Sequence, residues 1–216
     1  DPENNGYYMD GTFKAGGIPM AYGSYQSLII TGSDSAFALP ASGFLQKSGR
    51  GNSYTLEFWL KANPMTESRI MVPQGNNDGV YVSPGFIGIK VGQFSEFYYI
   101  GKWNRPMLVH FQYSPKKMTL MVNGTIVVSI DINEPLELNE ADDEIWFYGM
   151  GTFYEVDSIA LYPYLVPPQM AKKHFVYGQG VQEYDFSNDK FLKSTMQIDY
   201  PVAGYSYNVM YPDTIK

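Results

Sequence analysis

The sequence contains no cysteine, so disulfides cannot stabilise it, and a thiol nucleophile and a cysteine-ligated metal are both excluded. Charged residues make up 17% of its 216 residues, below the share of about 25% that is usual for globular chains. Positive charge is the scarcer sign, and the net charge is −7. The adjacent basic pairs Lys116-Lys117 and Lys172-Lys173 do not make the basic patch that nucleic-acid binding requires, which argues against a nucleic-acid partner.

Long hydrophobic runs are also missing from the sequence. No apolar stretch approaches the roughly 20 residues that a membrane-spanning helix needs, and we therefore expect no membrane insertion. The chain begins at Asp1 with neither an initiator Met nor a signal peptide. We expect it to be a segment of a longer protein or a processed product.

Aromatic residues, in contrast, are abundant. They make up 16% of the chain, and 19 of them are tyrosines. Tyr and Phe favour strands, because a flat ring packs well on a pleated surface. A tyrosine also combines a rigid ring with a polar tip, which suits contact with proteins or glycans. The length and the 44% share of hydrophobic residues are sufficient for one large β domain with a sizeable core.

Short apolar or alternating runs recur along the chain at a spacing of about 8–12 residues, each bounded by Gly, Pro or Asn. This pattern is typical of a β-sandwich or jelly roll. The clearest element is the pair of runs at 118–122 and 125–130, because Asn123-Gly124 between alternating runs predicts a β-hairpin with a two-residue turn.

A second alternating run lies at 54–60, where one face carries Tyr54, Leu56, Phe58 and Leu60. Trp59 lies out of phase with them, which indicates that the opposite face of this strand is covered too. The single helix that the sequence predicts spans roughly 168–175, with proline at its start, where proline is tolerated.

We therefore predict an all-β fold, a two-sheet antiparallel jelly-roll sandwich with one short helix. Residues 1–23 are expected to be a lead-in segment that adds an edge strand. Residues 24–182 are expected to form the jelly roll itself. Residues 183–216 are expected to be a C-terminal extension of strand and linker.

Four segments resemble, in order, strands of the laminin-G-like, concanavalin-A-like jelly-roll domains. These segments are Tyr54–Lys61, Gly101–Tyr113, Met118–Gly124 with its Asn-Gly hairpin, and Tyr154–Tyr162. The stretch Ala171–Val181 is similar to the tails of such domains in large phage structural proteins. The resemblance implies the jelly-roll fold over roughly residues 20–180, but this fold carries lectins, glycosidases, adhesins and plain spacers.

The resemblance to phage proteins favours a non-enzymatic structural or interaction module of a virion, in a tail, fibre or capsid-associated protein. Its partners would be neighbouring virion chains, it would be an oligomer, and its location would be the virion. The alternative is a lectin-like, glycan-binding module for host attachment, at an extracellular or cell-surface location. No cofactor is required in either case, although Ca²⁺ could take part in glycan binding.

The candidate ligand-binding residues are Asn76, Asn77 and Asp78 together with Tyr98 and Tyr99. Short polar side chains can hydrogen-bond to sugar hydroxyls, and aromatic rings can stack on a sugar. The alternative interpretation is an ordinary turn beside a half-buried strand. Trp59 and Trp103 could also stack on sugars, but their positions favour structural packing.

The candidate metal ligands are Asp34 and Asp157. Asp157 is in phase with Ile159 and Leu161, so we expect it to point inward, where a carboxylate must be paired or hydrogen-bonded. We favour a hydrogen-bonded structural carboxylate. The alternative is a Ca²⁺ ligand, with Asp34 as a second oxygen donor.

One pattern resembles an enzyme. Glu140, Asp142 and Glu144 have the spacing that laminarinase-type glycosidases of this fold place on a strand, where two carboxylates could act as nucleophile and acid/base. The acidic segment around them lacks apolar alternation and indicates a solvated loop, so we predict no enzymatic activity and no catalytic residue; a glycoside hydrolase is the remote alternative. His110 and His174 are far apart in the sequence and lack acidic partners at ligand spacing, which argues against zinc.

Overall fold

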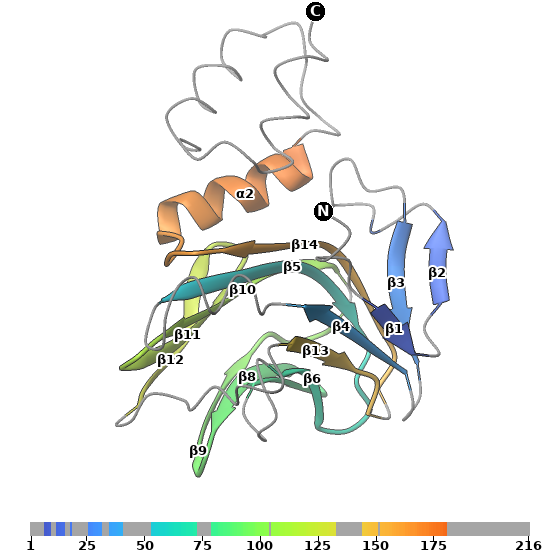
Figure 1. Cartoon of the computed structure of the whole chain (residues 1–216), viewed down its shortest axis with the longest axis horizontal. Coiled ribbons are helices and arrows are strands. Elements are labelled where there is room, and N and C mark those ends of the chain that lie inside the picture. The colour runs from blue at the N-terminus through green and yellow to red at the C-terminus, as the bar shows by residue number, and fades with distance from the viewer. Residues whose placement is uncertain are drawn as a thin grey trace, which may run out of the picture.

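The computed structural model describes residues 7–9, 12–15, 18, 26–31, 35–40, 53–72, 79–103, 105–132, 144–150 and 152–180. These residues form two antiparallel sheets of seven strands each, which pack face to face, and one helix lies on the outside of the sandwich (Figure 1). The predicted fold, an all-β two-sheet antiparallel sandwich with one short helix, is confirmed.

We call the first sheet sheet A. Its strand order begins at one edge with β1 and ends at the other with β9. In spatial order its strands are β1 (Tyr7–Met9), β4 (Ala36–Pro40), β13 (Glu144–Tyr148), β6 (Ser68–Val72), β7 (Gly79–Ser83), β8 (Phe86–Val91) and β9 (Phe94–Tyr99).

The second sheet, sheet B, runs from β12 at one edge to β2 at the other. In spatial order its strands are β12 (Thr125–Asp131), β11 (Lys117–Val122), β10 (Met107–Ser114), β5 (Tyr54–Ala62), β14 (Tyr154–Tyr162), β3 (Gln26–Ile30) and β2 (Thr12–Ala15). Neighbours far apart in the sequence, such as β5 and β14, give the crossovers expected of a jelly roll.

The predicted hairpin is the β11–β12 pair. Asn123 and Gly124 form its turn with φ angles of 53° and 76°. Two successive positive φ angles match the right-handed twist of the flanking strands, and Asn and Gly adopt them at the lowest cost.

The core lies between the inner faces of the two sheets. The alternation predicted for β5 is confirmed, because Leu56, Phe58 and Leu60 are fully buried there. The Phe58 ring meets the ring of Phe147, on β13 of the opposite sheet, edge to face with 5.1 Å between their centroids. Side chains from both sheets therefore interlock in one continuous apolar layer.

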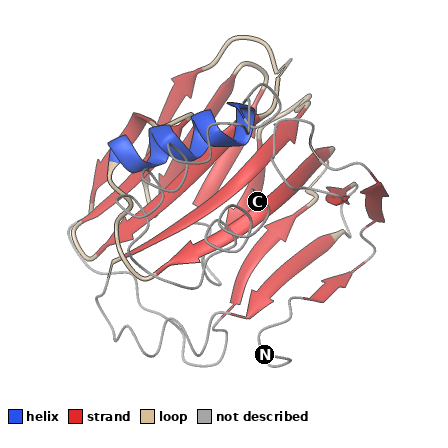
Figure 2. Cartoon of the chain, turned by 90° about the horizontal axis from the view of Figure 1, so that it is seen from above, coloured by secondary structure: helices blue, strands red, loops and turns tan. Residues whose placement is uncertain are grey.

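The outer face of sheet B is covered as well, which gives the molecule a third layer. The helix α2 (Pro168–Gly180) lies across this face (Figures 1 and 2). Trp59 of β5 is only 2% exposed and packs with Ile18, Leu108 and Phe175. The prediction that Trp59 marks a second covered face is confirmed. The helix starts at the predicted proline but continues past residue 175, to Gly180.

The described residues of the lead-in segment contribute to both sheets. β1 lies at an edge of sheet A and β2 at an edge of sheet B, while Ile18 is buried under the outer layer. The extension at 183–216 lies outside the described residues. Within the described residues, no helix has the length and apolar character needed to cross a membrane.

Candidate functional site

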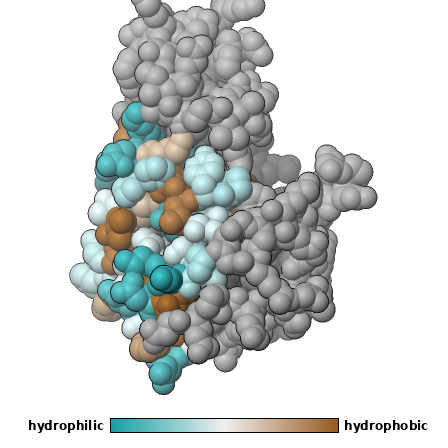
Figure 3. Space-filling view, turned by 60° about the vertical axis from the view of Figure 1, so that its left-hand side comes forward, coloured by the Kyte–Doolittle hydropathy of each residue, from teal (hydrophilic) through white to brown (hydrophobic). Residues whose placement is uncertain are grey.

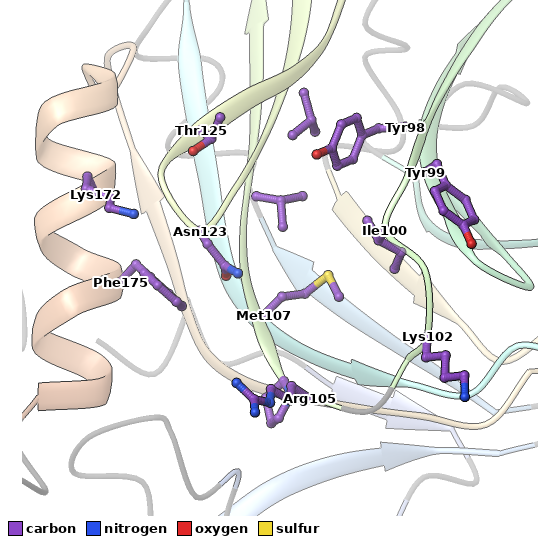
Figure 4. Close-up of a pocket in the computed structure, with 13 residues that line it drawn as sticks. Tyr98, Tyr99, Ile100, Lys102, Arg105, Met107, Asn123, Thr125, Lys172 and Phe175 are labelled. Carbon is purple, nitrogen blue, oxygen red and sulfur yellow. The ribbon is translucent and has the colours of Figure 1, made fainter.

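A groove of about 450 Å³ lies where β9, the following loop, the β11–β12 turn and α2 come together (Figure 4). One wall is formed by Tyr98, Tyr99 and Ile100 at the end of β9. The other is formed by Asn123 and Thr125 of the hairpin and by Lys172 and Phe175 of α2. The groove therefore combines three separate segments of the sequence, 98–107, 122–127 and 172–175.

Two tyrosines supply the exposed aromatic surface of this groove. The Tyr98 side chain is 44% exposed and that of Tyr99 is 66% exposed. They lie on β9, the edge strand of sheet A, with which no described strand pairs on its outer side. Tyr98 lies opposite Ile87 and Tyr99 opposite Phe86, so the two rings stand on opposite faces of the strand.

The charged residues that line the groove are all basic. They are Lys102 and Arg105 from the loop after β9 and Lys172 from α2, and no described lining residue is acidic. The Lys172 ammonium also lies 5.5 Å from the centre of the Phe175 ring, within the range of a cation–π interaction. In a chain of net charge −7, this concentration of positive charge favours an anionic ligand.

The β11–β12 turn fixes the base of the groove. The Asn123 backbone N–H donates to the Leu108 carbonyl at 2.8 Å, and the Asn123 side-chain Oδ1 accepts from the Leu108 N–H at 2.9 Å. Gly124 lies directly against the backbone of Lys172, so the turn also contacts α2. The position of Lys172 in the groove is therefore set by a rigid hairpin.

The groove contains two of the five predicted ligand-binding residues, Tyr98 and Tyr99. Asn76, Asn77 and Asp78 lie outside the described residues, so their role stays a prediction. Sequence reasoning missed the basic residues, because Lys102 and Lys172 lie 70 residues apart and only the docking of α2 brings them together.

A second polar cluster lies buried between sheet B and α2. Glu57 of β5, His110 of β10 and His174 of α2 expose no more than 2% of their surfaces. Glu57 Oε2 lies 2.7 Å from His110 Nε2 and is also in contact with His174 Nδ1. The inference that the two histidines lack an acidic partner was wrong, because strand pairing and helix docking bring Glu57 to both of them.

The histidines determine the charge state of this carboxyl. Burial by itself would raise the pKa of Glu57, but electrostatic interaction and hydrogen bonding with His174 and His110 hold that pKa well below its usual range. Glu57 is therefore a carboxylate, and the cluster is a buried ionic group that links three elements.

Asp157 is buried, as predicted, but on the other face of the sheet. It lies opposite Trp59, whereas Leu161 lies opposite Leu56, so Asp157 and Leu161 face opposite sides. A bulge between Asp157 and Ala160, with φ of 50° at Ser158, reverses the alternation. The prediction that Asp157 is in phase with Leu161 was therefore wrong.

Both oxygens of the Asp157 carboxylate accept hydrogen bonds. Oδ2 accepts from the Ile18 N–H at 2.8 Å, and Oδ1 accepts from the Ser158 hydroxyl at 3.1 Å. These contacts agree with the structural interpretation of this residue. Asp34 lies outside the described residues, so a Ca²⁺ site at Asp34 and Asp157 stays a prediction.

The remaining sequence candidates have no site around them in the described part of the chain. Of the acidic triplet, Glu144 begins β13, while Glu140 and Asp142 lie outside the described residues. Trp103 packs against the core, and its indole N–H donates to the Ser83 carbonyl at 2.9 Å, so the structural interpretation of this tryptophan is confirmed.

No family model and no curated protein matches this chain. Solved structures do resemble it. The receptor-binding domain of the botulinum neurotoxin C/D mosaic serotype has a TM-score of 0.62 at 13% identity, over 80% of this chain and 46% of that one. A structure of botulinum neurotoxin type C, whose description says that its cell entry depends on interaction with two ganglioside molecules, has a TM-score of 0.59 at 13% identity, over 79% of this chain and 47% of that one.

The binding domain of botulinum neurotoxin DC in complex with SialylT has a TM-score of 0.63 at 12% identity, over 82% of this chain and 46% of that one. The chain thus spans about half the length of these domains. The first is described as a receptor-binding domain and the third as a binding domain. At such low identity the likeness shows a shared β-sandwich fold alone.

Proposed function

We propose that this chain is a glycan-binding recognition module, and that the groove between β9 and α2 binds an acidic sugar. The observation that carries the proposal is the meeting of the exposed Tyr98 ring with three basic side chains in one groove. Such a module would act outside the cell, at an extracellular or virion surface.

The chemistry of the lining residues matches the two faces of an acidic sugar. A tyrosine ring can pack on the apolar C–H face of a pyranose, while its hydroxyl reaches a sugar hydroxyl. Arg105 can bind a carboxylate through two parallel hydrogen bonds, and Lys102 and Lys172 add compact positive charges. The groove is also within the size range of small-ligand sites, about 300–1,000 Å³.

The comparisons support this proposal without locating a ligand. The related toxin structures are described as interacting with gangliosides or as complexed with SialylT. Because this chain corresponds to about half of those domains, the position of the sugar in this groove is our own inference.

Binding of a short sialylated oligosaccharide, compared with its asialo counterpart, tests the proposal. Calorimetry with the purified chain should show binding that depends on the acidic sugar. Tyr98→Ala and Arg105→Ala should each weaken it by about 10-fold or more, the effect of losing one stacking or charge-assisted contact.

Two matched controls separate the groove from general surface effects. Phe94→Ala removes an exposed aromatic residue at the other end of β9, and Lys117→Ala removes an exposed cation from β11. Both should bind as the unmodified chain does. Equal weakening in all four variants, or no difference between the sialylated and asialo sugars, would refute the proposed site.

A structural module of a virion is the second candidate function. It is favoured by the free edge of β9, whose exposed Phe94, Tyr98 and Tyr99 could contact a neighbouring chain. On the described part of the face shown in Figure 3, however, hydrophobic residues form separate patches between hydrophilic ones. A permanent interface is usually more continuously apolar.

The oligomeric state in solution tests this second function. An oligomer that persists when the unmodified protein is diluted, and that is lost in Phe94→Asp, would favour it.

A further inference from the structure

Glu57, His110 and His174 lie apart from the groove and have no part in the proposed glycan binding. We propose that these three residues form a binding site for a divalent transition-metal cation, with zinc as the best match, that holds α2 on sheet B. The proposal rests on the geometry and chemistry of this cluster alone and does not depend on the proposed function.

The position of the three donors suits a single ion. His110 Nε2, His174 Nδ1 and a Glu57 carboxylate oxygen all lie within 4.8 Å of one another. Zinc binds nitrogen and oxygen at about 2.0–2.2 Å, so donors of a tetrahedral site lie about 3.3 Å apart. The contacts of Glu57 Oε2 with His110 Nε2, at 2.7 Å, and with His174 Nδ1 are both shorter than that spacing, so these side chains would have to move slightly apart to admit the ion.

The types of donor select the class of metal. Two imidazoles and one carboxylate suit zinc, cobalt or nickel. Calcium is disfavoured because it takes six to eight oxygen ligands, and this cluster offers a single carboxylate. Three protein ligands leave one coordination position, which a water molecule can fill.

His110 gives independent support for a ligand. Its ring is completely buried, and its Nδ1 has no hydrogen-bond partner within the described part of the chain. Its Nε2 faces Glu57 Oε2 at 2.7 Å. The same Glu57 oxygen also contacts His174 Nδ1, so both imidazoles converge on one carboxylate, and a single cation could bind all three donors.

Each donor comes from a different element, so a bound ion would cross-link three of them. Glu57 and His110 face each other on the paired strands β5 and β10, and His174 of α2 contacts Glu57. Apolar contacts on either side, between Trp59 and Phe175 and among Tyr162, Val166 and Ala171, already dock the helix. The ion would fix the rotation of α2 on the sheet.

The composition of the chain makes this proposal easy to test. The sequence has two histidines, both in the cluster, and no cysteine, so no other imidazole or thiol can bind the metal. The protein should be prepared without a histidine tag, stripped with EDTA and titrated with ZnCl₂ at pH 7.5 by calorimetry. The expected result is one zinc per chain, and zinc at 100 times its Kd should raise Tm by about 5–10 °C.

Cobalt provides a second measurement that requires no variant. Co²⁺ in a site with two imidazoles should give an intense visible absorption that zinc displaces. Absence of stoichiometric zinc uptake, together with absence of this absorption, would overturn the proposal and leave a hydrogen-bonded His–Glu–His cluster.

Variants then assign the site. Glu57→Gln keeps the shape of the side chain but removes its charge, and should weaken zinc binding by about 100-fold or more. His174→Ala should do the same, and circular dichroism will show whether it still folds. The matched control is Phe175→Leu, which alters the packing of α2 on Trp59 but leaves the donors in place. Zinc binding that is unchanged in Glu57→Gln would show that the ion binds elsewhere, and the proposal would fail.

Discussion

Gly124 of the β11–β12 turn lies directly beneath Lys172 of α2, so close that a Cβ at position 124 would stand less than 3.0 Å from the Lys172 backbone. The same glycine has a φ of 76°, which an L side chain rarely adopts. A glycine is therefore needed at position 124 for two reasons: it adopts the positive φ of the hairpin turn, and its lack of a Cβ lets the helix pack closely on the turn.

Gly124→Ala should destabilise the protein strongly. The positive φ costs about 1–2 kcal/mol, and the clash with the helix backbone adds about 1–3 kcal/mol. We expect a loss of about 2–5 kcal/mol in the free energy of unfolding, measured by urea denaturation.

Gly92→Ala is the matched control for this substitution. Gly92 also has a positive φ, 55°, but a Cβ there would meet no atom within 4 Å. Gly92→Ala should lower the free energy of unfolding only by the cost of the positive φ, about 1–2 kcal/mol. Equal losses in the two variants would mean that the helix does not press on the turn.

Local features of the fold could be predicted from the sequence, because each depends on neighbouring residues. The Asn123-Gly124 hairpin and the alternation of β5 are of this kind, and both are confirmed. The position of Asp157 on the outer face could not be predicted, because the bulge at Ser158, a non-glycine residue with positive φ, leaves no sequence signal.

The candidate site was less accessible to sequence reasoning. Tyr98 and Tyr99 could be identified as exposed aromatic residues near a turn. Lys172 could not be assigned to the same groove, and His174 could not be paired with Glu57, because these contacts span more than 70 residues. They depend on where α2 docks, and the apolar pattern of the helix does not specify its position on the sheet.

Tyr154→Phe should destabilise the sandwich through the loss of one hydroxyl group. The Tyr154 hydroxyl lies 2.7 Å from the Tyr148 carbonyl and 3.0 Å from the Ile70 carbonyl, and it is completely buried. Its removal leaves a buried carbonyl without its donor, which costs about 1–3 kcal/mol. Chemical denaturation should show this loss, while Tyr99→Phe, at an exposed hydroxyl, should change stability by less than about 0.5 kcal/mol.

Alkaline pH should destabilise the protein through its buried tyrosines. Burial raises the pKa of Tyr154, and of Tyr54, above the ordinary value of 10.0. Below pH 10 these tyrosine hydroxyls keep their protons in both the folded and the unfolded protein. Above pH 10 they lose their protons in the unfolded protein but keep them in the folded one. Each such tyrosine should lower the free energy of unfolding by about 1.4 kcal/mol per pH unit above 10. In Tyr154→Phe the free energy of unfolding should fall less steeply with pH above 10 than in the unmodified chain. An unchanged slope would contradict the conclusion that the buried Tyr154 hydroxyl contributes to the alkaline destabilisation.

Asp157→Ala should destabilise the outer layer without involving calcium. The Asp157 carboxylate accepts the Ile18 N–H and the Ser158 hydroxyl, so its removal leaves a buried N–H without an acceptor. That loss costs about 1–3 kcal/mol, and Asp157→Asn, which keeps one side-chain oxygen as an acceptor, should lose less.

Because the Asp157 carboxylate already has these donors, 5 mM Ca²⁺ or EDTA should leave the Tm of the unmodified chain unchanged. A rise in Tm with Ca²⁺ that disappears in Asp157→Asn would instead identify Asp157 as a calcium ligand and revive the pairing with Asp34.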